Sequence, residues 1–402
     1  MEVMPILSTL RRNKVGAMLV ALQIALTLAV VANALAVIQR HWTDMTRPSG
    51  LDEANIFSMA NQWVGQPDDL AARIETDMAA LRALPGVVDA EATNSFPLSG
   101  RSWVWGASVK SHQATESAQT SVYFDTVHGL AAQGLRLAVG RWFTPDEVIE
   151  FKTNEIKSTP SVVLSAALAK RLFPDGQALG RSVYVTGDEP ERVVGIVERA
   201  TSASGTGMEY VEFSTFVPGQ LVNSQLLYLV RTKPGQQQAV MRGAKQRLLE
   251  ISRLRILNAV EPFSDSRTNL FAVAAATNWL LATVCALLLV ITACGTVGLT
   301  MLWVAQRRRQ IGMRRALGAR RIDILRYFHT ENLLISAAGA LLGIATGLGA
   351  NLWFAKHLAM TRMSPVYIVA GALVVLLLSQ LAVLWPALRA ATVPPSLAAR
   401  GL

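Results

Sequence analysis

Four long stretches of the chain are apolar and hold no charged residue, whereas the rest of the sequence mixes apolar and polar positions. A helix of about 20 residues crosses the roughly 30 Å hydrocarbon core of a bilayer. Each stretch has at least this length, so the pattern predicts four transmembrane helices. We place them at residues 15–40, 268–306, 332–355 and 363–388.

The first stretch also shares features with a signal peptide. Three basic residues, Arg11, Arg12 and Lys14, precede it, and an Ala-Asn-Ala-Leu-Ala run near Asn33 is similar to a cleavage site. Signal peptides, however, have apolar regions of about 7–15 residues. The apolar run here is longer than that range, so a retained membrane anchor is the favoured interpretation.

Between the first two apolar stretches, residues 41–267 alternate between strand and helix patterns. Within residues 54–96, a short apolar strand precedes a helix at 66–84, and a second strand follows. The helix is indicated by apolar residues three or four positions apart, namely Leu70, Ile74, Met78, Leu81 and Leu84. Residues 224–264 repeat the order strand, helix, strand. These two β-α-β halves predict one small α/β module.

The intervening residues, 97–223, are richer in strand and turn signals. SVVLSAALAKRLFPDGQALGRSVYV indicates strand, helix, turn and strand, with Pro174-Asp175-Gly176 at the turn. We therefore expect a second module inserted into the first. The predicted fold class is an α-helical membrane protein with four transmembrane helices and a large α/β domain outside the membrane.

The positive charge of the protein is concentrated in short segments. The formal net charge is +10 at pH 7. Residues 1–14 contain 3 Lys and Arg and residues 307–326 contain 8, whereas residues 40–270 hold 23 Lys and Arg against 25 Asp and Glu. Short loops rich in Lys and Arg stay in the cytoplasm. We therefore expect both termini (1–14 and 389–402) and the loop 307–331 to be cytoplasmic. The basic composition reflects topology and indicates no nucleic-acid partner.

The sequence lacks the motifs of several enzyme classes. It contains no G-x-x-x-x-G-K-[ST] phosphate-binding loop, no H-E-x-x-H and no C-x-x-C. Asp125 lies near His128, but no nucleophile motif accompanies them. Apart from Arg40 at the end of the first, the four apolar stretches also carry no Asp, Glu, His or Arg, one of which ion-driven transporters usually need. We expect a non-catalytic chain, without a metal site, that takes its energy from elsewhere.

The second apolar stretch is longer than a bilayer requires. Its 39 uncharged residues would form a helix of about 58 Å at about 1.5 Å per residue. We expect this helix to project into the external domain. Trp279 and Trp303, about 36 Å apart on such a helix, suit the two interfacial belts of aromatic residues.

The loop after this stretch concentrates charge. RRRQIGMRRALGARRIDI, residues 307–324, contains seven arginines. We expect the second helix to continue to residue 317, Gly318 to end it, and a short helix at 320–328 to follow. Binding to anionic lipid would account for arginines. It would not require the apolar residues and glycines among and beside them, so we favour a structured surface for a protein partner. These residues are Ile311, Gly312, Leu317, Gly318, Ile322 and Leu325.

Five stretches of the sequence resemble one family. VAQRRRQIGMRRALGARRIDILRYFHTENLL is similar to the signature loop of FtsX/MacB-type ABC-transporter permeases, with its I-G-x-x-R-A-x-G-A core and a short helix ending near a glutamate, here Glu331. Four further stretches resemble the family in chain order: LRRNKVGAMLVALQIALTLAVV, YFDTVHGLAAQGLRLAVGRWFTPDE, VVLSAALAKRLFPDGQALGRSV and WPALRAATVPPSLAARGL. Together they extend over nearly the whole chain.

The resemblance implies a permease subunit in the inner membrane of a bacterium, with the α/β domain in the periplasm. That domain would hold a porter-like module, residues 54–96 and 224–264, interrupted by the inserted module. A separate ABC ATPase would bind ATP and Mg²⁺, and the long second helix would transmit its movement to the periplasm. No cofactor is expected in this chain. MacB itself carries its ATPase on the same chain, so this sequence departs from it there.

In the family, the loop between helices two and three holds the coupling helix that docks on the ATPase. Carried over to this sequence, its core falls on residues 314–324. The residues assigned to docking are Ile311, Gly312, Arg314, Arg315, Ala316, Leu317, Gly318, Ala319, Arg321, Ile322 and Ile324. The other partners implied are a second permease subunit, in a homodimer or heterodimer, a periplasmic adaptor protein and membrane lipid.

The third predicted helix carries three glycines on one face. Gly339, Gly343 and Gly347 form two successive G-x-x-x-G spacings, which let another helix approach closely. That neighbour belongs either to this chain or to the second permease subunit.

Several functions remain open at this point. The first is efflux of small molecules or peptides together with an adaptor. The second is extraction of lipoproteins toward an outer membrane, and the third is regulation of a periplasmic hydrolase, as in FtsX-like proteins. A membrane sensor that works without an ATPase is the fourth, but it leaves the coupling loop unexplained.

Overall fold

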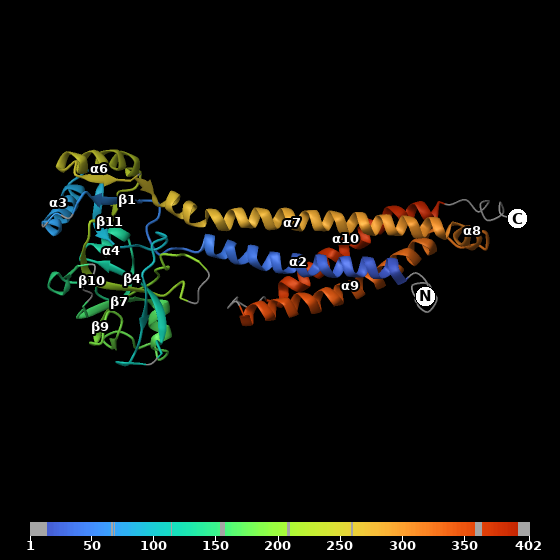
Figure 1. Cartoon of the computed structure of the whole chain (residues 1–402), viewed down its shortest axis with the longest axis horizontal. Coiled ribbons are helices and arrows are strands. Elements are labelled where there is room, and N and C mark those ends of the chain that lie inside the picture. Colours follow the sequence, from blue (N-terminus) through green and yellow to red (C-terminus); the bar gives the residue numbers. More distant parts are fainter. Residues whose placement is uncertain are drawn as a thin grey trace. The chain divides into compact units, whose positions relative to one another are not determined.

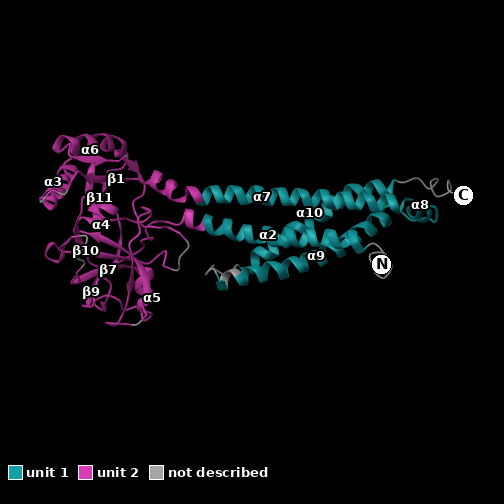
Figure 2. Cartoon of the chain, viewed as in Figure 1, with its two compact units in different colours: residues 1–42, 274–402 teal, residues 43–273 magenta. Residues whose placement is uncertain are grey.

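The computed structural model describes residues 14–65, 67, 69–113, 115–152, 157–206, 210–258, 260–357 and 364–392. The predicted cytoplasmic N-terminus up to residue 13 and the predicted tail from residue 393 lie outside these described residues. The chain divides into two compact units (Figure 2). We call residues 1–42 and 274–402 the helical unit and residues 43–273 the α/β unit.

The first sheet of the α/β unit is antiparallel throughout, with strand order β12-β1-β11-β2 and β13 beside β1. Its strands are β1 (Ile56–Trp63), β2 (Val87–Thr93), β11 (Gln225–Thr232), β12 (Arg255–Leu257) and β13 (Glu261–Pro262). Helix α3 (Leu70–Arg82) connects β1 to β2, and α6 (Gln237–Ile251) connects β11 to β12. Figure 1 shows the two helices beside this sheet.

Successive side chains of this sheet are buried on opposite faces, because a strand has a period of two residues. Phe57 and Tyr228 pack in one core with Met78 of α3. Their neighbours in sequence, Ile56 and Leu229, pack in another core against Phe263 and Phe271 at the start of α7. Both faces are therefore covered, and nearly all of β1 is buried.

The second sheet has strand order β3-β4-β10-β7-β9-β5 and mixes parallel and antiparallel pairs. β6 pairs with β10 and β8 with β9. Its strands are β3 (Val104–Ala107), β4 (Ala118–Asp125), β5 (Leu137–Gly140), β6 (Ile149–Lys152), β7 (Ser161–Ser165), β8 (Ser182–Val183), β9 (Glu191–Val197) and β10 (Ser214–Val222). Two short helices, α4 (Gly129–Gln133) and α5 (Ala166–Leu172), accompany them.

The two sheets share hydrogen bonds where β2 ends. Thr93 Oγ1 donates to the carbonyl of Phe124 at 3.0 Å, and Asn94 exchanges two bonds with the backbone of β4. Apolar residues of both sheets also form one continuous core. The α/β unit therefore behaves as a single packed body.

The helical unit contains four helices that are long and apolar enough to cross a membrane. The helices are α2 (Lys14–Thr46), α7 (Phe263–Gln306), α8 (Arg308–Ala316), α9 (Arg321–His357) and α10 (Pro365–Ala391), of which all but α8 are candidate spans. All four candidate spans contribute to one core, which includes Ile24, Trp303, Ile335 and Val375. The predicted fold class, four transmembrane helices with a large α/β domain, is confirmed.

Two helix boundaries differ from those predicted. The second helix does not continue to residue 317, because α7 ends at Gln306 and α8 follows as a separate helix. The short helix predicted at 320–328 is instead part of α9. No glycine or proline occurs in residues 320–338. The charge of Glu331 is neutralised by an ion pair with Arg307. The helix therefore continues through this segment.

Candidate functional site

The predicted docking loop begins with a small break between α7 and α8. Arg307 has φ −102° and ψ 8°, outside the ideal helical values. Its N–H nevertheless donates to the carbonyl of Trp303 at 3.0 Å, and its carbonyl accepts from Ile311 N–H at 3.0 Å. The helical hydrogen bonds thus pass through the break, and α8 continues from the end of α7 with a local change of direction.

Arg307 also makes a buried ion pair. Its Nη1 lies 2.8 Å from Oε2 and 3.0 Å from Oε1 of Glu331 on α9. Both residues are almost fully buried, and the guanidinium stacks over Trp303 with its carbon 6.0 Å from the ring centre. A paired guanidinium can be buried at much lower cost than a free one, so the pair fixes the start of α8 against α9.

Trp303 therefore has a different place from the one predicted. Trp279 is 77% exposed, as a residue facing the membrane interface should be. Trp303 is only 6% exposed and packs in the core of the helical unit. Packing against apolar residues of the other helices, such as Ile24 and Ile335, accounts for its burial.

The turn between α8 and α9 depends on Gly318. The last carbonyls of α8 accept bonds from Leu317, Gly318 and Ala319 N–H at 3.0–3.1 Å. Gly318 has φ +96°, in the left-handed region that favours glycine. Asp323 Oδ2 accepts from the backbone of Arg320 at 2.9 Å and so caps the start of α9. The chain thus forms the helix end predicted at Gly318.

Burial separates the predicted docking residues into two groups. Ile311, Gly312 and Ile324 are buried, the two isoleucines against Val383 and Ala387 of α10. Their contacts hold α8 and α9 on the helical unit. The other predicted residues are exposed or half-buried: Arg314, Arg315, Ala316, Leu317, Gly318, Ala319, Arg321 and Ile322.

Three apolar side chains are exposed within this arginine-rich segment. Leu317 is 84% exposed, Met313 is 52% exposed and Ile322 is 50% exposed. We call Met313, Leu317 and Ile322 the exposed apolar triplet. Arg314, whose guanidinium lies over the ring of Tyr327 at 5.2 Å, is also exposed beside it. Apolar side chains bordered by arginine suit a protein partner that offers apolar contacts and carboxylates.

The sequence did not indicate two features of this site. Met313 was not assigned to docking, although its side chain is 52% exposed on α8. The pair of Arg307 with Glu331 joins residues 24 positions apart. An isolated acid at the edge of an apolar run was the only signal that could have suggested a buried partner.

The three glycines of α9 face α2 of the same chain. A Cβ on Gly339 would lie 2.6 Å from the carbonyl oxygen of Ala21, and one on Gly343 would lie 2.8 Å from that of Ala25. The approach is less close at Gly347, where an added Cβ would lie 3.5 Å from the Cα of Ala29. The backbone of α9 thus approaches α2 closely within this chain.

Polar side chains in the helices bond to one another. Thr27 and Thr292 share a buried bond of 2.8 Å between α2 and α7, and Asn332 Nδ2 donates to Ser379 Oγ at 2.9 Å. Such bonds stabilise helix packing in lipid. Among the described residues, no group of three His, Cys, Asp or Glu side chains could hold a metal ion.

Asp125 and His128 bond to other partners and not to each other. His128 Nδ1 lies 3.0 Å from Asp89 Oδ2. Asp125 is fully buried, and its Oδ2 accepts from Gln133 at 2.7 Å. Burial raises the pKa of Asp125 to about 7, and burial together with the nearby charge of Asp125 raises the pKa of Glu91 well above its usual value. Burial thus favours the protonated form of both carboxyls.

The chain matches two family models. One is described as a MacB-like periplasmic core domain and covers residues 18–247, and the other as an FtsX-like permease C-terminal and covers residues 282–395. Among curated proteins, it is 31% identical over 246 residues to the macrolide export ATP-binding/permease protein MacB of Chromobacterium violaceum, covering 58% of this chain and 35% of that protein. The protein of the same name from Agrobacterium fabrum is 30% identical over 238 residues, which cover 55% of this chain and 34% of that protein. The chain thus spans about a third of the length of these relatives.

Two solved structures are also similar. The extracellular domain of the noncanonic ABC-type transporter YknZ from Gram-positive bacteria matches with TM-score 0.32 and 16% identity, covering 50% of this chain and 99% of that one. The periplasmic region of MacB from Actinobacillus actinomycetemcomitans matches with TM-score 0.31 and 16% identity, covering 52% and 90%. At these TM-scores neither structure supports a conclusion about this chain.

Proposed function

Because this chain belongs to the MacB-like family of FtsX-type ABC-transporter permeases, we propose that it couples ATP hydrolysis in a separate ATPase subunit to movement of its periplasmic domain. The output of that movement is efflux of small molecules or peptides. The coarse assignment, an inner-membrane permease with four apolar helices and a periplasmic domain, is the premise. The energy source, the direction of coupling and the cargo are the proposal.

The exposed apolar triplet carries this proposal. Leu317 is among the most exposed large apolar side chains of the described residues, and it follows directly after a helix rich in arginine. Solvation of such a side chain is unfavourable by roughly 25 cal/mol per Å², so a partner that covers it gains binding energy. The family position of this loop makes the ATPase the partner we propose.

The transmission path starts at Arg307. Its pair with Glu331 ties the start of α8 to α9, while α8 follows directly on α7. A displacement of the docked turn therefore acts on both helices. Helix α7 has 44 residues, about 66 Å at about 1.5 Å per residue, and its first residues contribute Phe263 and Phe271 to the α/β core. We propose that this helix carries the movement between the two sides of the membrane.

The remaining partners follow from the same proposal. A second permease subunit completes the transporter, and a periplasmic adaptor receives the cargo. The relatives named above combine ATP-binding and permease regions in one protein, whereas we assign ATP and Mg²⁺ to a partner ATPase. Both termini and the arginine-rich loop lie in the cytoplasm in this topology.

A pull-down tests the docking proposal. The tagged chain is co-expressed with the proteins of its neighbouring genes and purified in detergent, as wild type and as the variant carrying Leu317→Asp and Ile322→Asp, and an ABC ATPase is sought among the proteins that co-purify. The variant should insert normally but retain less than about a tenth of the ATPase. The matched control carries Leu254→Asp and Ile256→Asp, two apolar residues of the α/β unit with similar exposure. Equal ATPase recovery from both variants would exclude this surface as the docking site.

The same preparation identifies the periplasmic partner. Cross-linking of the full chain in membranes should capture an adaptor protein if efflux is the function. Capture of a lipoprotein carrier would support lipoprotein extraction instead. Capture of a cell-wall hydrolase would support the regulatory function.

A further inference from the structure

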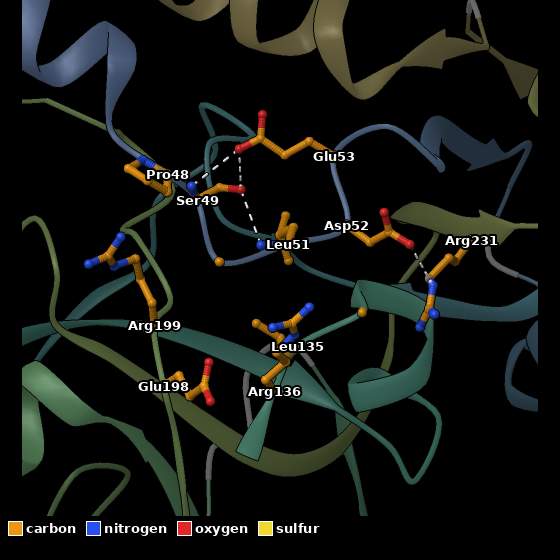
Figure 3. A pocket seen from close by; sticks show the side chains of 12 residues that line it. Pro48, Ser49, Leu51, Asp52, Glu53, Leu135, Arg136, Glu198, Arg199 and Arg231 are labelled. Carbon is orange, nitrogen blue, oxygen red and sulfur yellow. Dashed lines mark hydrogen bonds and ion pairs between the residues drawn. The ribbon is translucent and has the colours of Figure 1, made fainter. Parts of the chain in front are cut away.

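The α/β unit contains a polar cavity of about 840 Å³ that the transport proposal does not use (Figure 3). The cavity is lined by residues 48–53, 134–136 and 198–199 and by Arg231. Pro48 comes only two residues after the end of α2 at Thr46. The segment that immediately follows a candidate membrane span in the sequence thus forms part of the cavity lining.

Some of the charged groups around the cavity are satisfied by the protein itself. Asp52 Oδ2 lies 3.1 Å from Arg231 Nε, and Arg231 Nη1 also donates to the carbonyl of Ala131 at 2.7 Å. Both oxygens of Glu53 accept from Arg267 Nη1, at 2.6 and 2.7 Å. These charges hold the walls together and are not available to a ligand.

Three other charged side chains in the cavity behave differently. Arg136, Glu198 and Arg199 are exposed, and among the described residues their side chains form no hydrogen bond or ion pair. Figure 3 shows them in one cavity, with no interaction drawn between them. Two guanidinium groups and one carboxylate therefore line the same cavity, and none of them has a hydrogen-bond or ion-pair partner among the described residues.

The backbone that presents these side chains is tightly fixed. Glu198 N–H donates to the carbonyl of Arg136 at 2.9 Å, and Thr201 N–H donates to that of Ser49 at 2.9 Å. Gly50 has φ +93°, and a Cβ there would lie 2.1 Å from the carbonyl oxygen of Arg199. Only glycine permits this approach, so the loop 48–53 is held against the strand end that carries Arg199.

We propose that this cavity binds a zwitterionic ligand that contains a phosphate and an ammonium group. Arg136 and Arg199 hold the phosphate, because guanidinium groups match phosphate oxygens in geometry and charge. Glu198 accepts the ammonium. A simple anion would leave Glu198 unpaired beside it and would be repelled by that carboxylate, so the combination of charges favours a zwitterion.

Two sources supply this chemistry, a phosphatidylethanolamine headgroup and free phosphoethanolamine. Binding to either source is independent of the ATPase, so the result does not depend on the proposed transport function.

The test uses the full chain in detergent and in nanodiscs. Phosphoethanolamine and inorganic phosphate are titrated calorimetrically into the detergent sample. Nanodiscs of phosphatidylethanolamine or phosphatidylglycerol are compared by counting lipids retained in native mass spectrometry. We expect tighter binding of phosphoethanolamine than of phosphate, or retention of more phosphatidylethanolamine than phosphatidylglycerol, or both. Preference only among the lipids identifies the source as the membrane, and preference only among the soluble ligands identifies it as the free compound.

Variants assign the binding to the cavity. Arg136→Ala with Arg199→Ala should weaken binding at least tenfold, whereas Arg253→Ala, an exposed arginine elsewhere in the α/β unit, should leave it unchanged. Glu198→Gln should abolish the preference for ammonium-bearing ligands while phosphate still binds. The proposal is overturned if neither source is preferred, if the double variant binds like Arg253→Ala, or if Glu198→Gln keeps the preference.

Discussion

Among the described residues, each unit of this protein contains one buried pair of an arginine and a carboxylate, and the two pairs are built differently. In the α/β unit, Arg255 on β12 binds Asp77 on α3, and both side chains are fully buried. In the helical unit, Arg307 binds Glu331 at the junction of α7 and α8. Both arginines lie over a tryptophan, Arg255 at 3.9 Å from the ring centre of Trp63 and Arg307 at 6.0 Å.

The difference is in how completely each carboxylate is satisfied. Arg255 meets Asp77 with two nitrogens, Nη1 at 2.6 Å and Nη2 at 2.8 Å, and Tyr228 donates to the same carboxylate at 2.7 Å. Arg307 uses Nη1 alone for both oxygens of Glu331. Each arginine has one nitrogen that is buried without a partner among the described residues, Nε of Arg255 and Nη2 of Arg307.

The comparison indicates what each pair does. A fork of two parallel bonds fixes geometry as well as charge, so the pair in the α/β unit locks α3 to the closing strand of the first sheet. The pair in the helical unit holds a helix junction with a single nitrogen. This pair fixes the start of α8 against α9 without the second parallel bond of the fork.

The largest effect is expected from breaking the forked pair. Asp77→Ala leaves Arg255 buried without its partner, which costs on the order of 3–5 kcal/mol. We expect the melting temperature of the α/β unit to fall by on the order of 10 °C, measured by circular dichroism of the full chain in detergent. Asp175→Ala removes an exposed pair with Arg181 and should leave melting unchanged. Equal effects would mean that the buried pair contributes little.

A smaller loss is expected at the helix junction. Glu331→Ala should destabilise the helical unit by about 1–3 kcal/mol, because the long side chain of Arg307 can turn partly toward water. Replacing both partners, Arg307→Met with Glu331→Leu, should restore the melting temperature, since an apolar pair avoids the cost of burying charge. ATP-driven activity should stay low in the double variant. Restored activity would show that the pair serves stability alone.

The helical unit can also be tested at its closest backbone contact. Gly339→Ala would place a methyl group 2.6 Å from a backbone oxygen of α2, and overpacking of this kind costs about 1–3 kcal/mol. Gly349 on the same helix has open space around it. Gly349→Ala should therefore stabilise slightly, by up to about 1 kcal/mol of helix propensity. The melting temperature in detergent should fall for Gly339→Ala and rise slightly for Gly349→Ala. A lower melting temperature for both variants would contradict the assigned packing.

The smallest effect concerns a buried carboxyl that has no arginine. The folded pKa of Asp125 is about 7, above the unfolded value of about 3.9, so the folded state holds the proton more tightly. Its contribution to stability is greatest below pH 4 and is lost as pH rises to about 7. Asp125→Asn should reduce the fall in melting temperature between pH 5 and pH 8 by a few degrees. Asp146→Asn, at an exposed site, should not, and an unchanged pH dependence in Asp125→Asn would refute the raised pKa.

Much of the fold could be predicted from the sequence because the relevant patterns are local. Charge-free stretches gave the four spans, and apolar spacing of three or four residues gave α3, observed from Leu70 to Arg82. The helix end at Gly318 also followed from one residue, since its φ of +96° favours glycine. The break at Arg307 could not be predicted in this way, because nothing in the local sequence interrupts a helix there.

The sequence by itself determined the number of membrane helices, the α/β character of the large domain and the position of the arginine-rich turn. Each depends on the length or period of a local pattern, which the chain carries wherever it folds. Only the tertiary structure decided which residues of that turn face outward, that the glycines of α9 meet α2, and that Asp77 binds Arg255. Asp77 and Arg255 are 178 positions apart, and packing alone selects one partner among the many that charge would allow.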